Sequence, residues 1–367
     1  MKREMVDLKN NERAYNELPL LPPLSKSIES NKILKQLVSS SVLLAELKGM
    51  VNILPNPTIL LNAAILKEAK TSSEIENIIT TQDMLYTALS AKGVQVDSST
   101  KEVLRYREAL IYGTSFIKEN EFLSVNAIIE IQRRLEDSNA GLRKLPGTAL
   151  RNSKTGKVIY TPPDNLSDIN RLLRNFEKYI NERDSIPYLI KMAIQHYQFE
   201  SIHPFYDGNG RTGRIINILY LMMSGLIDKP VLYLSGYIIE NKSEYYKLLQ
   251  EVRTKNNWEG WIIYMLKGVE YSARIALDQV ITINKLLEST KEKVQRKSPK
   301  IYSSELVELL FEQPYCKSDF LEKRLLISRI TAAKYLKELE RIEVLQSHKV
   351  WKETIYVNKQ LFELFRK

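Results

Sequence analysis

The chain has 367 residues, 44% of them hydrophobic, so it is long enough for two or three domains with real cores. Glycine and proline are sparse at 13 each, which argues against a disordered chain and against an all-β, turn-rich fold. The net charge is +10, and residues 291–367, with 17 basic and 11 acidic side chains, supply +6 of it. A lone Cys316, no apolar signal-peptide core and no run of ~18 apolar residues predict a cytoplasmic protein without membrane contact.

Apolar residues recur with helical spacing along most of the chain, which predicts a mainly α fold. Asn56 and Pro57 are typical of a helix start, with Asn as the cap and Pro in the first turn. Thr71 and Glu74 match a capping box, which predicts a separate short helix over about 71–79. Further helices are expected at residues 31–51, 84–89, 99–116 and 125–135.

The middle of the chain departs from helical spacing between residues 141 and 163. The β-branched and aromatic run 157–160 predicts a small β-hairpin whose turn lies near residues 155–156. Helices then resume, interrupted by a loop at 201–210, and the charged stretch 289–300 predicts a linker. The helices expected in this part are 167–181, 186–199, 211–223, 243–254 and 258–287.

The loop before the helix at 211–223 combines glycines with a helix start. Gly208 and Gly210 flank Asn209, so successive backbone N–H groups can point inward beside the positive end of the helix. Arg211 and Arg214 lie three residues apart on one face, where two guanidinium groups suit a polyphosphate. This combination predicts a phosphate-binding cradle.

Two further side chains of the loop add chemistry to the cradle. Asp207 lies at its mouth, and a single carboxylate beside phosphates is typical of a Mg²⁺ site. His203 precedes it, and an imidazole with an ordinary pKa near ~6.5 can accept a proton at neutral pH. The stretch therefore predicts transfer of a phosphorus-containing group to a hydroxyl.

The string His203-Pro-Phe-Tyr-Asp-Gly-Asn-Gly-Arg-Thr-Gly-Arg resembles the Fic family motif at every fixed position. The resemblance implies a helical Fic core with a β-hairpin flap, and transfer of AMP from ATP, with Mg²⁺, to a Ser, Thr or Tyr hydroxyl of a protein. It implies His203 as the catalytic base, Asp207 as the metal ligand and Phe205 as a buried anchor. It assigns ATP binding to Asp207, Gly208, Asn209, Gly210, Arg211, Thr212, Gly213, Arg214, Tyr245 and Tyr246.

A second string, Ser72-x-x-x-Glu76-Asn77, resembles the inhibitory motif of the same family. The resemblance implies that Glu76 pairs with Arg214 and occupies the place of the ATP γ-phosphate. Like charges repel, so ATP would bind only with its α-phosphate misaligned, which silences the reaction. We therefore expect Glu76→Gly to activate the protein and His203→Ala to inactivate it.

The expected partner is a target protein docking on the hairpin near Leu150–Tyr160, which resembles the family's flap. The hairpin lacks the valine-x-isoleucine-glycine stretch common in such flaps. His196, on the preceding helix, is expected to be a packing residue. A homodimer is a further expected assembly.

The chain divides by these patterns into an N-terminal helical region (1–115), a Fic core (116–288), the linker and a C-terminal unit (301–367). The C-terminal unit is expected to be a winged helix-turn-helix, with its second helix at 328–339 and a β wing at 344–357. Duplex DNA is the less favoured partner because acidic side chains interrupt the basic face of that helix. Two alternatives to AMP transfer stay open: an AMP-removing enzyme, and a DNA-binding regulator with a Fic sensor core.

Overall fold

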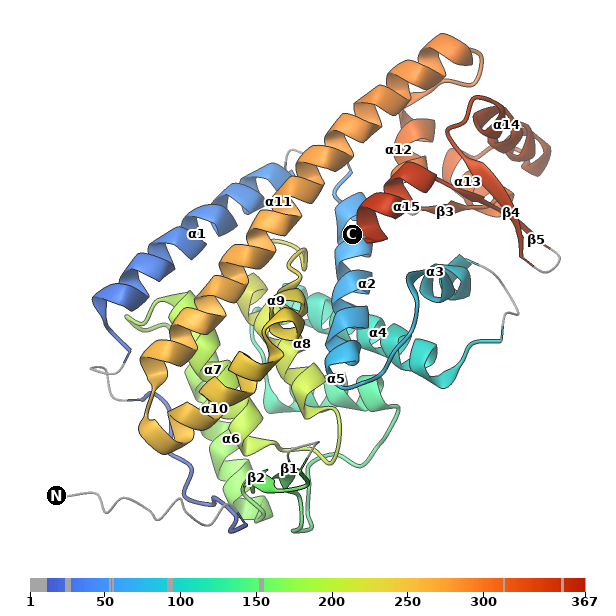
Figure 1. The fold of residues 1–367 in the computed structure, drawn as a ribbon. Coiled ribbons are helices and arrows are strands. Elements are labelled where there is room, and N and C mark those ends of the chain that lie inside the picture. Colours follow the sequence, from blue (N-terminus) through green and yellow to red (C-terminus); the bar gives the residue numbers. More distant parts are fainter. Residues whose placement is uncertain are drawn as a thin grey trace.

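The protein is mainly helical, with two small antiparallel sheets (Figure 1). The structure is a computed structural model that describes residues 12–23, 28–52, 54, 56–90, 95–151, 155–312, 314–350 and 353–366. This confirms the predicted fold class. None of the helices described is long and apolar enough to cross a membrane.

Among the described residues up to Tyr160, the chain forms five helices and the hairpin. In order, these are α1 (Asn31–Asn52), α2 (Thr58–Ile75), α3 (Gln82–Ser90), α4 (Ser98–Asn120), α5 (Val125–Glu136), β1 (Leu150–Arg151) and β2 (Val158–Tyr160). The predicted hairpin is present, and Leu150 of β1 lies opposite Tyr160 of β2.

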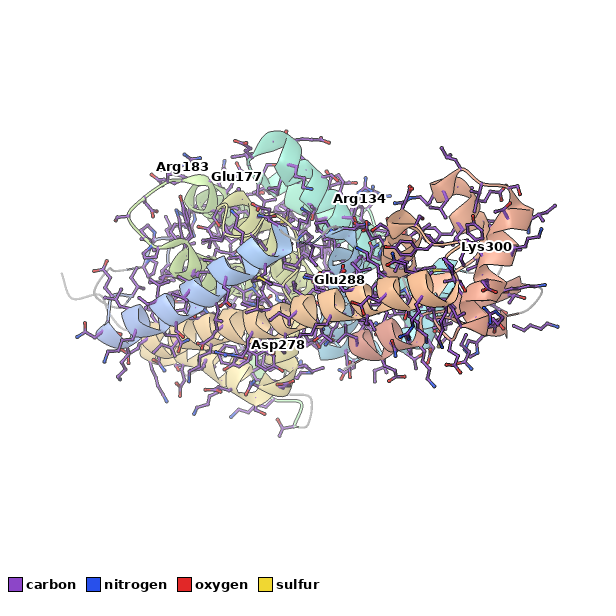
Figure 2. All side chains as sticks on the ribbon, turned by 90° about the horizontal axis from the view of Figure 1, so that it is seen from above. Arg134, Glu177, Arg183, Asp278, Glu288 and Lys300 are labelled. Atoms are coloured by element: carbon purple, nitrogen blue, oxygen red, sulfur yellow. The ribbon has the colours of Figure 1, made fainter. Side chains whose placement is uncertain are left out.

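The centre of the molecule is built by the next six helices. They are α6 (Leu166–Asn181), α7 (Tyr188–Ile202), α8 (Asn209–Met223), α9 (Leu234–Glu240), α10 (Lys242–Lys255) and α11 (Trp258–Lys297). Helices α7 and α8 are buried along almost their whole length and carry the site between them. Helix α11 runs from this core toward the C-terminal elements, as Figure 2 shows by the positions of Asp278 and Glu288 on the helix and of Lys300 just beyond its end.

The linker predicted at 289–300 is wrong, because α11 continues without a break to Lys297. The charged side chains there cover only the outer face of the helix. Leu287, Thr290 and Val294 keep the spacing of one helical face, and all three are buried. The hydrophobic stripe, rather than the surface charge, decides the structure of this segment.

The separate helix predicted at 71–79 is also wrong, because α2 runs unbroken to Ile75. The Thr71 hydroxyl does not cap a helix but lies 2.8 Å from the hydroxyl of Tyr233. Ala69 and Ile75 are buried on the same helix, so the apolar face continues through the supposed start signal. Helix α9 was not predicted at all.

The C-terminal elements follow the order α12 (Ser304–Glu312), β3 (Tyr315–Cys316), α13 (Ser318–Leu325), α14 (Arg329–Arg341), β4 (Gln346–Val350), β5 (Glu353–Val357) and α15 (Lys359–Arg366). The three strands form one antiparallel sheet with β5 in the middle. Ser328 caps α14 by accepting a hydrogen bond from the Thr331 amide at 3.1 Å. The winged helix-turn-helix itself stays a prediction.

These C-terminal elements pack on α2 and α3 rather than standing apart. The Asn62 amide of α2 donates to the Glu312 carbonyl at 3.1 Å, and the Tyr315 hydroxyl donates to Asp83 of α3 at 2.9 Å. The ring of Tyr86 stacks on Tyr315 with centroids 5.3 Å apart. The segment between α2 and α3 is thus held by contacts on both of its sides.

Candidate active site

The turn from α7 to α8 is fixed by its own residues. His203 ends α7 in the left-handed region at φ 48°, and Gly208 adopts φ 77° just before α8. Phe205 lies between them, and the Asn209 side chain accepts from its amide and donates to its carbonyl, both at 2.8 Å. Phe205 itself is fully buried, as predicted. The loop is therefore preorganised.

Arg143 stabilises this turn through hydrogen bonds, and no sequence pattern predicted this role. Its guanidinium donates to the His203 carbonyl at 2.7 Å and to the Pro163 carbonyl at 2.7 Å, and its backbone N–H donates to the Pro204 carbonyl at 2.9 Å. Arg143 is fully buried. A lone Arg in an irregular segment carries no signal, because its partners are carbonyls that are remote in sequence.

His203 is held in its neutral, basic form. Burial, together with the positive charges of Arg143 and Arg253, lowers the pKa of its imidazole to about 4. At neutral pH the ring is therefore deprotonated and able to accept a proton. This agrees with the base role that the sequence predicts.

The first turn of α8 already faces a carboxylate. A Cβ atom placed on Gly210 would lie 2.6 Å from Oε1 of Glu76 and 3.0 Å from the Arg214 guanidinium. Only glycine leaves room for this approach. The Glu76 carboxylate consequently lies beside the first turn of α8, next to Gly210 and Arg214.

Glu76 and Arg214 form the ion pair predicted from the sequence, with 2.7 Å between Oε1 and Nη2. Arg214 is almost fully buried, and it also donates to the hydroxyl and the carbonyl of Ser72 at 2.7 and 2.8 Å. Burial alone would raise the pKa of the Glu76 carboxyl, but Arg214 outweighs burial and the pKa lies below its usual value. Glu76 ends α2, and Asn77 follows in the left-handed region, which asparagine tolerates.

Arg211 does not join this pair, although the sequence predicts that Arg211 and Arg214 lie on one face of the helix and bind phosphate together. Its guanidinium lies 2.8 Å from Glu136 and 3.3 Å from Glu102. Burial raises the pKa of Glu136, and the negative charge of nearby Asp207 adds to that effect although Arg211 opposes it. Glu102 and Glu136 were missed, because single carboxylates on amphipathic helices resemble ordinary surface residues.

Asp207 lies exposed at the mouth of the cradle. Its Oδ1 accepts from the Gly208 amide at 2.7 Å, and its carbonyl accepts from the Gln132 side chain at 3.1 Å. Among the residues that the structure describes, there is no group of three or more His, Cys, Asp or Glu side chains that could hold a metal. One carboxylate completed by phosphate oxygens and water is nevertheless what Mg²⁺ commonly uses, so Asp207 fits such an ion.

The remaining predicted ligands differ in accessibility. Thr212 is fully buried, and Gly213 lies against Phe199 and Glu200 of α7, so it faces away from the cradle. Burial raises the pKa of the Glu200 carboxyl to about 7.

Of the two predicted tyrosine ligands on α10, Tyr245 is buried and Tyr246 is exposed. Tyr245 is buried, and its hydroxyl lies 2.9 Å from His196 Nε2, which gives His196 the packing role that the sequence predicts. Tyr246 is 46% exposed, and its ring meets that of Tyr245 edge to face. Only Tyr246 offers a face to a ligand.

Three family models match successive parts of this chain. The Fic/DOC family N-terminal model matches residues 34–115, and the Fic/DOC family model matches residues 122–221, which include the whole loop from His203 to Arg214. The model for the C-terminal domain of SoFic-like protein adenylyltransferases matches residues 286–361. Residues 34–221 are therefore similar to the two domains that the Fic/DOC models describe.

Relatives of known name agree with this assignment. The chain is 28% identical over 173 residues to the protein adenylyltransferase Fic of Aedes aegypti, and 27% identical over 172 residues to that of Drosophila melanogaster. Each alignment covers 46% of this chain but only 32% and 33% of the relative. The chain thus spans about a third of the length of the curated relatives it matches.

Two solved structures share the fold. A Fic family protein from Desulfovibrio desulfuricans G20 superimposes with a TM-score of 0.58 at 17% identity, covering 92% of this chain and 98% of that chain. Fic-1 from C. elegans gives a TM-score of 0.53 at 22% identity, covering 68% of this chain and 73% of that chain. At these identities the similarity concerns the fold alone.

Proposed function

We propose that this protein is an autoinhibited AMP transferase, which moves AMP from ATP to a Ser, Thr or Tyr hydroxyl of a target protein and of itself. The observation that supports it most is the loop between α7 and α8. There a neutral histidine ends α7, and the first turn of α8 lies beside a carboxylate that a buried arginine holds. The names of the relatives point to the same activity.

In the proposed reaction, His203 removes the proton of the acceptor hydroxyl while its oxygen attacks the α-phosphorus of ATP. The bond from the α-phosphorus to the bridging oxygen breaks, and pyrophosphate leaves with its electron pair. Glycines at 208 and 210 give the phosphates access to backbone N–H groups, and the buried Arg214 receives the terminal phosphate. Tyr246 is the side chain best placed to contact the base of the nucleotide.

Asp207 would hold Mg²⁺ through its carboxylate, with Glu136 contributing negative charge nearby. Such an ion neutralises phosphate charge when it is bound. The residues of the chain bind the phosphates, position the acceptor hydroxyl and accept its proton.

Inhibition follows from competition for one cation. The Glu76 carboxylate pairs with Arg214 and lies over Gly210, which are the groups that the terminal phosphate would contact. A nucleotide entering beside Glu76 meets a like charge, so its α-phosphate is displaced from the line of attack. Glu76→Gly removes this carboxylate and leaves Arg214 free for the phosphate.

The test is label transfer to protein from ATP labelled at the α-phosphate, in parallel with γ-labelled ATP, with Mg²⁺ present. Wild type, Glu76→Gly and Glu76→Gly/His203→Ala are compared. We expect label from the α-position only, strong in Glu76→Gly and absent from the double variant. Equal labelling by wild type and Glu76→Gly would refute the inhibitory role. Label from the γ-position would indicate phosphoryl transfer, and turnover of AMP-modified protein by wild type would indicate AMP removal.

We also propose the finer assignments of organisation. The target protein docks on the hairpin β1–β2, and the chain divides near residues 115 and 288, although these boundaries lie inside α4 and α11. A cytoplasmic location agrees with the single cysteine, Cys316, which is buried. A homodimer is tested by light scattering, and DNA binding by a salt-dependent mobility shift.

A further inference from the structure

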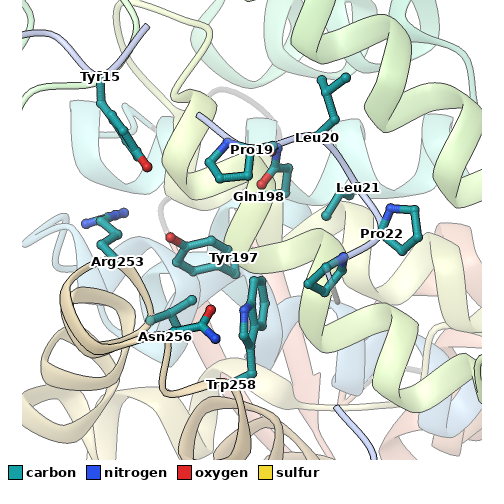
Figure 3. A pocket seen from close by; sticks show the side chains of 12 residues that line it. Tyr15, Pro19, Leu20, Leu21, Pro22, Tyr197, Gln198, Arg253, Asn256 and Trp258 are labelled. Carbon is teal, nitrogen blue, oxygen red and sulfur yellow. The ribbon is translucent and has the colours of Figure 1, made fainter. Parts of the chain in front are cut away.

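A pocket of about 420 Å³ includes Tyr197 and Gln198 of α7, the helix that ends at the catalytic turn (Figure 3). Its size is within the range of ~300–1,000 Å³ that ligand pockets occupy. Tyr197 of α7 and Trp258 of α11 form one wall, and the N-terminal segment from Pro19 to Pro23 forms another. We call it the Arg253 pocket, after the one charged side chain among the described residues that line it.

Arg253 is held in place without a carboxylate. Its guanidinium stacks 3.7 Å from the ring centre of Tyr160 and donates to the Ser201 hydroxyl at 3.3 Å and to Gln250 at 3.4 Å. Within the described part of the chain it forms no ion pair, and its buried Nε has no hydrogen-bond partner. A half-buried cation without a counter-ion is costly, so this arrangement points to an anion that arrives from outside.

The anion would have one negative charge. A phosphate group usually meets two or more cations or a helix N-terminus, whereas this pocket offers one guanidinium. In Figure 3, the hydroxyl ends of Tyr15 and Tyr197 lie on the Arg253 side, and prolines and Trp258 line the other side. One guanidinium flanked by phenols and an apolar wall suits a carboxylate on an aliphatic stem.

The position of the pocket identifies the source of that carboxylate. Tyr160, which Arg253 stacks upon, ends the hairpin strand β2, and Ser201 lies two residues before His203. The inhibitory pair of Glu76 and Arg214 lies instead at the start of α8, on the nucleotide side of the turn. The pocket thus adjoins the hairpin and the catalytic base.

We propose that the Arg253 pocket binds the carboxylate of an Asp or Glu side chain of the target protein, close in space to the hydroxyl that receives AMP. This assignment rests on the proposed function. A bound carboxylate would also offset the positive charge of Arg253 next to His203 and make the imidazole more basic when the correct acceptor is in place.

Direct binding tests the pocket without any catalytic activity. The probe is N-acetyl-glutamate amide, and N-acetyl-glutamine amide is its neutral match, both followed by NMR on the full chain. We expect the glutamate probe alone to bind, about tenfold more weakly to Arg253→Gln and with intermediate strength to Arg253→Lys. Arg274→Gln, an exposed arginine on α11, is the control and should bind like wild type. Equal binding of both probes, or no loss in Arg253→Gln, would overturn the proposal.

Site mapping then tests the link to the acceptor. AMP-modified sites in a cell lysate are compared after labelling by Glu76→Gly and by Glu76→Gly/Arg253→Gln. We expect acidic residues near the modified hydroxyl to be enriched by the first protein and not by the second. The same enrichment, or none, with both proteins would overturn the acceptor assignment. Probe binding without any labelling would refute the AMP transfer and, with it, the acceptor assignment, and leave only a carboxylate site.

Discussion

Gly210 offers a test of where the inhibitory carboxylate lies. Alanine at this position keeps a helical backbone but adds the one atom that would lie 2.6 Å from Oε1 of Glu76. We expect Gly210→Ala to destabilise the wild-type protein and to stabilise the Glu76→Gly protein. The difference between the two backgrounds follows from the contact with Glu76, because the substitution and its 3.0 Å approach to Arg214 are the same in both.

The magnitude follows from two opposing contributions. Exchanging glycine for alanine in a helix stabilises by up to about 0.5–1 kcal/mol. The added Cβ forces Glu76 away from Arg214, and breaking a fully buried ion pair costs about 3–5 kcal/mol. The Glu76 side chain is 35% exposed, so solvent screening reduces this to about 1–2 kcal/mol. The two variants should therefore couple by about 1–2 kcal/mol.

The assay is urea unfolding of the four proteins of this double-mutant cycle, followed by tryptophan fluorescence. Gly49→Ala is the matched control, because a Cβ atom placed on this helical glycine of α1 would meet no other atom within 4 Å. It should stabilise both backgrounds equally. If Gly210→Ala had the same effect with and without Glu76, the carboxylate would not lie over the start of α8, and the inhibition argument would fail.

Two further predictions concern the reaction of the Glu76→Gly protein. Glu136→Gln removes one of the two carboxylates that hold Arg211, and we expect kcat/KM for ATP to fall by about 3–10-fold and the thermal stability to fall as well, because the pair is buried. The pKa of His203, about 4, predicts a labelling rate that stays flat down to mildly acidic pH, since the neutral ring is the base. Arg253→Gln removes a charge that lowers this pKa, so the acid limb should move to higher pH; an unmoved limb would contradict the assignment.

The sequence predicts best what depends on neighbours in the chain. The cradle at Gly208 and Gly210 and the base at His203 lie in one short string, and local backbone rules suffice to interpret them. The pair of Glu76 and Arg214 joins residues 138 positions apart. Its prediction came from resemblance to a family motif and not from physical rules.

What the sequence could not supply depends on packing between distant elements. Arg143, Glu102 and Glu136 acquire their roles only when α4, α5 and the loop after α7 meet. The supposed linker failed for a related reason, since its surface charge hides a buried stripe through Val294. Composition describes the exposed face of such a helix, whereas tertiary contacts decide whether it continues.

The same packing decides how Glu76 can leave Arg214. Moving α2 as a whole would expose buried residues such as Leu60, Leu66 and Ile75, and would break the bond from Asn62 to the C-terminal elements. Each large apolar side chain returned to water costs about 1.5–3 kcal/mol, so this route costs several times the ion pair itself. Rotation of the partly exposed Glu76 side chain breaks only its contact with Arg214. A nucleotide that competes for Arg214 therefore needs to displace one side chain, while the helix that carries it stays anchored.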